Sequence, residues 1–75
     1  MKIVYIEWLD ACSYQGWMDL TDDSPDTASI TTIGYLAEED DKQVLITSSL
    51  SETGNILGAV AIPKGWIRKR RNIKI

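Results

Sequence analysis

"IPKGWIRKRRNIKI", residues 62–75, is the stretch of sequence that decides between a helix and a strand, and with it the fold class. Read with the helical period of 3.6 residues, it has no continuous apolar stripe. Read with period two, it has one entirely polar face, made of Arg68, Arg70, Asn72 and Lys74. The opposite, inner face holds Ile67, Ile73 and Ile75, with Lys69 and Arg71 in the same register. We therefore predict a final strand whose polar face points outward.

The rest of the sequence continues this β pattern. In residues 3–9, Val4, Ile6 and Trp8 alternate with a second set of side chains, and Trp8 is expected in the core. Turn-forming residues separate the segments: a long loop over 10–28, an acidic loop over 38–42 and a tight turn over 51–55. We predict an all-β, five-stranded single domain over residues 1–75. The predicted strands are 3–9, 29–37, 43–50, 56–62 and 67–74.

Charge and composition limit the setting of the protein. The chain of 75 residues has a net charge of −3, yet six of its eight basic residues lie in 62–75. A single cysteine, Cys12, cannot form an internal disulfide, which predicts a reducing, cytoplasmic environment. Glu7 and Asp10 interrupt the apolar start of the chain, so we expect neither a signal peptide nor a membrane span, and no membrane partner.

Enzymatic and metal chemistry are not expected. The sequence has no histidine, so Cys12 has no imidazole to activate it. Asp22, Asp23 and Asp26 lie beside a proline, where carboxylates typically form solvated turns. The acidic run 38–41 lacks the ligand spacing of a calcium loop, and adjacent acids there should point to opposite sides. We therefore predict no enzyme activity, no metal site and no cofactor.

The order of predicted elements, together with the segment "AIPKGWI", resembles the SH3-like barrel. In SH3 domains the fourth strand runs into a one-turn 3₁₀ segment that has a proline followed three residues later by an aromatic residue. Pro63 and Trp66 match these positions, and the resemblance implies that they look like two residues of the SH3 peptide groove. It also implies a five-stranded SH3-like barrel with a long first loop and a 3₁₀ turn before the last strand. The segments "EWLDAC" and "QVL" differ from the SH3 residues at their positions.

A second resemblance concerns the pattern "VYIEWLDA…GW…IGYLAEED…IPKGWI". This pattern is similar to small uncharacterised proteins encoded by bacteriophages and prophages. It implies a phage or bacterial setting and no particular activity.

The aromatic residues suggest a docking surface for a protein. If the first loop and the 3₁₀ turn lie side by side, as the resemblance implies, Tyr14 and Trp17 meet Trp66. The expected rim is acidic and consists of Asp19, Asp22 and Asp23. Tyrosine and tryptophan with a charged rim are typical of protein-binding hot spots. In the other interpretation, which stays open, Trp17 folds inward and caps the core.

The basic residues suggest an alternative function. Arg68, Arg70, Arg71 and Lys74 are candidates for contacts with nucleic-acid phosphates. Cations on a terminal strand also discourage edge-to-edge pairing, or attract the protein's own acidic loops. We therefore expect a non-enzymatic binding module that docks on a protein, for example one of a bacterial host. The alternative is a small nucleic-acid-binding β-barrel that uses the basic strand.

Overall fold

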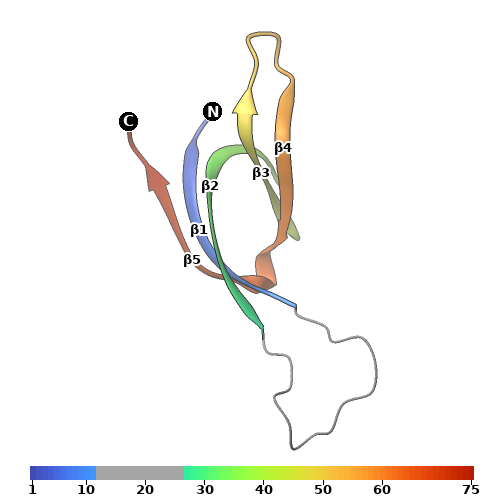
Figure 1. Cartoon of the computed structure of the whole chain (residues 1–75), viewed down its shortest axis with the longest axis vertical. Coiled ribbons are helices and arrows are strands. Elements are labelled where there is room, and N and C mark those ends of the chain that lie inside the picture. The colour runs from blue at the N-terminus through green and yellow to red at the C-terminus, as the bar shows by residue number, and fades with distance from the viewer. Residues whose placement is uncertain (12–26) are drawn as a thin grey trace, which may run out of the picture.

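The computed structural model describes residues 1–11 and 27–75, and these form five strands and one 3₁₀ turn (Figure 1). The elements in order are β1 (Ile3–Asp10), β2 (Ala28–Glu39), β3 (Gln43–Leu50), β4 (Ile56–Pro63), η1 (Lys64–Trp66) and β5 (Ile67–Ile73). Each predicted strand is confirmed to within two residues at either end, and so is the 3₁₀ turn before the last strand. No helix in the described residues is long and apolar enough to cross a membrane.

All five strands belong to one antiparallel sheet with the order β4-β3-β2-β1-β5. The long strand β2 is shared between two halves of the sheet. Its residues 28–35 pair with β1, and its residues 35–39 pair with β3. The all-β, five-stranded prediction is confirmed. Within the described residues, however, β4 and β5 are the two edges and do not pair, so the sheet is not a closed barrel.

The core lies on the inner face of this bent sheet. Val4, Ile6 and Trp8 of β1 are buried, as their alternation predicts, against residues from the other half of the sheet, namely Val44, Ile46 and Ile62. Each such aliphatic side chain contributes about 1.5–3 kcal/mol when it is fully buried. Trp8 also donates a hydrogen bond from Nε1 to Thr32 Oγ1, at 3.0 Å, so its polar atom is satisfied.

Close contact between the two halves depends on Gly34 in β2. A Cβ atom at this position would lie 2.5 Å from the Thr47 carbonyl oxygen of β3. Glycine therefore allows β3 to approach the point where β2 changes partner, and the sheet to fold over its own core.

The last strand differs from the prediction in the direction of its side chains. Trp8 pairs with Ile67 but Glu7 pairs with Lys69, so Arg68 is an extra residue in a β-bulge. Residues directly opposite each other on paired strands share a face of the sheet. Arg70 pairs with the buried Ile6 and thus lies on the inner face, whereas the side chains of Lys69, Arg71 and Ile73 lie on the outer face. The predicted alternation of β5 was therefore wrong beyond Ile67, because the bulge shifts it by one residue.

Candidate functional site

The surface around Trp66 is the part of the predicted docking site that the structure describes. Pro63 precedes η1 in an extended conformation. The Lys64 amide donates a hydrogen bond to the Lys42 carbonyl at 2.8 Å, which anchors the 3₁₀ turn to the loop between β2 and β3. The Trp66 ring stacks on Trp8, with ring centroids 6.4 Å apart and planes 18° from parallel. Trp66 nevertheless remains 40% exposed. One indole face is thus fixed against the core while much of the ring is available to a partner.

A shallow hollow of about 260 Å³ lies beside Trp66. Its lining residues are Leu9, Asp10, Ala11, Thr27, Trp66 and Arg68. Ala11 and Thr27 are the described residues that flank 12–26, so both ends of the first loop border the same hollow as Trp66. The predicted partners of Trp66 lie outside the described residues, and the composition of the full aromatic patch stays a prediction. These residues are Tyr14, Trp17, Asp19, Asp22 and Asp23.

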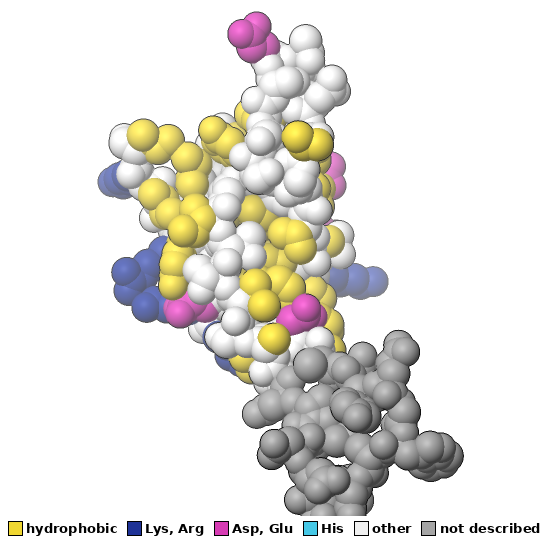
Figure 2. Space-filling view, viewed as in Figure 1, with side chains coloured by type: hydrophobic (Ala, Val, Ile, Leu, Met, Phe, Trp, Pro, Cys, Tyr) yellow, Lys and Arg dark blue, Asp and Glu magenta, His cyan; other side chains and the backbone are white. Residues whose placement is uncertain are grey.

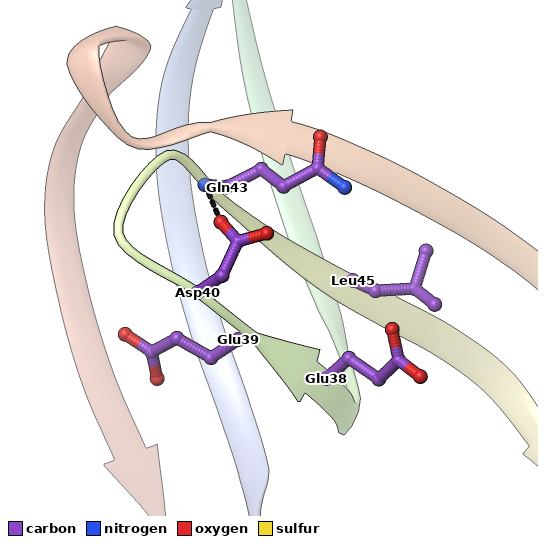
Figure 3. A pocket seen from close by; sticks show the side chains of 5 residues that line it. All are labelled: Glu38, Glu39, Asp40, Gln43 and Leu45. Atoms are coloured by element: carbon purple, nitrogen blue, oxygen red, sulfur yellow. Dashed lines mark hydrogen bonds between the residues drawn. The ribbon is translucent and has the colours of Figure 1, made fainter.

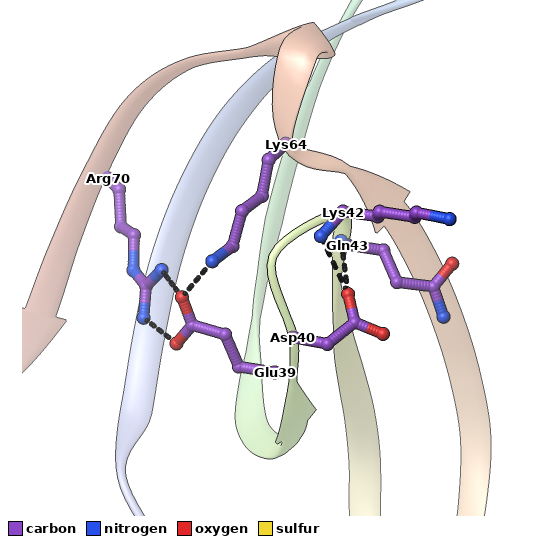
Figure 4. A network of polar contacts seen from close by, with 6 residues as sticks. All are labelled: Glu39, Asp40, Lys42, Gln43, Lys64 and Arg70. Atoms are coloured by element: carbon purple, nitrogen blue, oxygen red, sulfur yellow. Dashed lines mark hydrogen bonds and ion pairs between the residues drawn. The ribbon is translucent and has the colours of Figure 1, made fainter.

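Arg70, a candidate for nucleic-acid contact, is bound to a carboxylate of the protein itself. Its guanidinium donates two hydrogen bonds to the two Glu39 carboxylate oxygens, both at 2.9 Å (Figure 4). Lys64 Nζ lies 2.8 Å from Glu39 Oε2 and completes the cluster. The bonds from Arg70, then those from Lys64, lower the pKa of Glu39 from 4.5 to about 2. This contact confirms, for Arg70, the expected attraction between the basic strand and an acidic loop.

The other candidate cations have different surroundings. Arg68 donates to the Gly65 carbonyl at 3.3 Å. Arg71 lies on the outer face opposite Tyr5, and Lys74 is exposed beyond the end of β5. The outer face also presents Lys69, which the sequence placed on the inner side. Nothing local in the sequence marks the bulge at Arg68, so Lys69 could not be identified as a cation of the outer face without the pairing of β1 and β5.

The acidic run at the end of β2 borders a second hollow, of about 290 Å³ (Figure 3). The Asp40 carboxylate accepts hydrogen bonds from the Lys42 and Gln43 amides, both at 2.8 Å, which lower its pKa and close the β2–β3 turn. Glu38 and Glu39 point in different directions, as expected for adjacent strand residues. In residues 1–11 and 27–75, no group of three or more His, Cys, Asp or Glu side chains is arranged to hold a metal ion. Among these acids, Asp40 closes the turn and Glu39 holds the ion-pair cluster.

No protein-family model, curated protein or solved structure matches the chain. The resemblances to SH3 domains and to phage-encoded proteins stay predictions.

Proposed function

We propose that the protein is a non-enzymatic binding module that docks on a protein partner through the surface around Trp66. The observation that carries this proposal is the position of Trp66, which stacks on Trp8 and still exposes 40% of its surface. A tryptophan held in place before binding loses little conformational entropy when a partner covers it. Tryptophan is also among the residues most enriched in binding hot spots.

The remaining expectations form part of the same proposal. The order of strands, the bend in β2 and the 3₁₀ turn before β5 support an SH3-like barrel in which β4 and β5 face each other across the open side. A phage or prophage origin, a cytoplasmic location and a partner from a bacterial host follow from the resemblance and the composition. None of these requires a cofactor.

The second candidate is a nucleic-acid-binding barrel that uses the basic strand. It is favoured by the concentration of cations on β5, where four of seven residues are lysine or arginine. The ion pair between Arg70 and Glu39 counts against it, because a phosphate would have to compete with a carboxylate that is already in place. Arg68, Arg71 and Lys74 are the cations that remain from the predicted set.

The proposal can be tested with Trp66→Ala and a matched control, Leu57→Ala. Leu57 is a large apolar side chain on β4 that is 73% exposed and lies at the other edge of the sheet. With immobilised protein and a bacterial lysate, we expect Trp66→Ala to weaken capture of a specific partner by about 2 kcal/mol, roughly 30-fold in Kd. Leu57→Ala should capture the partner as wild type does.

Thermal melts of the same variants separate docking from folding. Trp66→Ala should keep a cooperative transition with a modest decrease in Tm, and Trp66→Phe should retain the stacking on Trp8. An unfolded Trp66→Ala variant, or undiminished capture by a folded one, would remove Trp66 from the docking surface.

A further inference from the structure

One edge of β5 has backbone groups that pair with no strand of the described residues. In the described sheet, β5 pairs with β1 on one side and is the last strand on the other. An edge strand of this kind presents a row of amide and carbonyl groups that an extended peptide can bind. This edge is therefore a candidate for strand addition.

The charge of β5 restricts which peptide would pair with it. The strand contains four cations and no acidic residue. Arg70 is neutralised by Glu39, whereas Lys69 and Arg71 form no ion pair with any described carboxylate. These two side chains are two residues apart on the same outer face. An extended peptide that carries carboxylates at alternate positions has the matching spacing, since side chains i and i+2 share a face of a strand.

Apolar side chains lie next to these cations. Arg71 pairs across the sheet with Tyr5, and Ile73 pairs with Ile3. A shallow hollow of about 510 Å³ is lined by Tyr5, Lys69, Arg71, Asn72 and Ile73. Figure 2 shows basic side chains gathered on the side of the molecule where β5 lies, with hydrophobic and acidic side chains beside them. The outer face is thus cationic at Arg71 and apolar at Ile73, and Lys69 lies opposite Glu7 of β1 without an ion pair to it.

We propose that the free edge of β5 binds an extended acidic peptide as an added strand. Two alternate carboxylates of the peptide lie over Lys69 and Arg71, and an apolar residue lies over Ile73. This inference goes beyond the proposed docking surface around Trp66, because it concerns a second surface and names the chemical class of the peptide that binds there. A peptide is favoured over a nucleic acid because only a peptide can continue the backbone ladder. Single-stranded nucleic acid, in contrast, relies on exposed aromatic rings, and the outer face of β1 and β5 presents only Tyr5.

The probe for this site is a short fluorescent peptide with two glutamates at alternate positions and a valine on each side, so that it fits in either strand direction. Fluorescence anisotropy at low salt should show binding that weakens as salt is added. We expect Arg71→Glu to lower the affinity about tenfold or more, because attraction becomes repulsion. The matched charge reversal Lys42→Glu, on an exposed lysine in the β2–β3 turn, should leave the affinity unchanged.

Two altered probes test the strand geometry. A peptide N-methylated at every residue keeps its charge but cannot form the ladder through either edge, and it should bind about tenfold more weakly or worse. A peptide of the same composition with adjacent glutamates should also bind more weakly. Equal binding of either altered probe would overturn strand addition. Tighter, Arg71-dependent binding of a thymidine oligonucleotide would instead assign the surface to nucleic acid.

A Trp66→Ala arm separates this inference from the proposed function. We expect the variant to retain binding of the acidic peptide even though it loses capture of the partner from a lysate. Lysate capture that depends on Trp66, with no binding of the peptide by wild type, would overturn the inference and leave the proposed function standing.

Discussion

The two edges of the sheet, β4 and β5, limit pairing with other strands in different ways. β4 contains no charged residue, and its exposed side chains include Ile56 and Leu57. β5 contains four cations in seven residues. An exposed apolar edge is an aggregation hazard, whereas a cationic edge repels a second copy of itself. β5 is therefore protected by charge, and β4 requires another form of protection.

The backbone of β4 supplies that protection. Gly58 adopts a φ of 72°, and the pairing of β3 with β4 skips Ser48 and Gly58. The Leu57 carbonyl accepts hydrogen bonds from Thr47 Oγ1 at 2.8 Å and Ser48 Oγ at 3.0 Å. An irregular strand is a poor template for another strand. The irregular backbone of β4 disfavours pairing with any added strand. The cations of β5 disfavour pairing with most strands but permit pairing with an acidic one.

Among changes at the two edge strands, the largest effect on stability is expected at the irregular point of β4. Gly58→Ala places a Cβ atom on a left-handed backbone, which costs about 1–2 kcal/mol in the free energy of unfolding. Urea denaturation should show this loss. Gly65→Ala is the matched control, because its Cβ would meet nothing within 4 Å, and we expect a change within about 0.5 kcal/mol. Equal losses in the two variants would contradict a special role of Gly58.

A smaller effect is expected at the ion pair that joins β5 to the end of β2. The pKa of Glu39 is lowered to about 2, so its charged form stabilises the folded state. That stabilisation is fully present above pH 4.5 and is lost as the pH falls toward 2. Glu39→Gln should therefore lower Tm at pH 7, and the difference from wild type should vanish near pH 2. Glu38→Gln is the control. If the Tm difference between Glu39→Gln and wild type did not depend on pH, it would not come from the charged carboxylate of Glu39.

The smallest change in the free energy of unfolding, within about 0.5 kcal/mol, is expected for substitutions that add a cation to the edge strand β4 or remove one from the edge strand β5. Leu57→Lys adds a cation to β4 and should reduce self-association at high protein concentration. Arg71→Val removes one from β5 and should increase it. Sedimentation equilibrium measures both. Lower association of Arg71→Val than of wild type would show that charge does not protect β5.

The elements of the fold could be predicted because their causes are local. Strand propensity and alternation mark the five strands, and Gly54, which has a φ of 88°, marks the tight turn between β3 and β4. The alternation of Val4, Ile6 and Trp8 predicts the buried face of β1, whereas the 3₁₀ turn at Pro63 and Trp66 was implied by the resemblance to SH3 domains. Each of these signals acts within a few residues of the structure that it predicts.

The candidate sites were only partly predictable. Trp66 was identified as a surface aromatic, but its stacking on Trp8 joins residues that are distant in the chain. The basic residues were identified as a group, but their division between an internal ion pair and a free outer face was not. Arg70 meets Glu39 across 31 positions, a contact that no local pattern specifies.

The sequence by itself thus determined the number, order and approximate ends of the strands, because backbone preferences and side-chain alternation act locally. Tertiary structure alone decided which way β5 turns its side chains. One extra residue, Arg68, opposite Trp8 reverses the alternation of the strand, and only its pairing with β1 fixes where that residue lies. The same pairing leaves Lys69 and Arg71 on the outer face beside Tyr5 and directs Arg70 inward to Glu39.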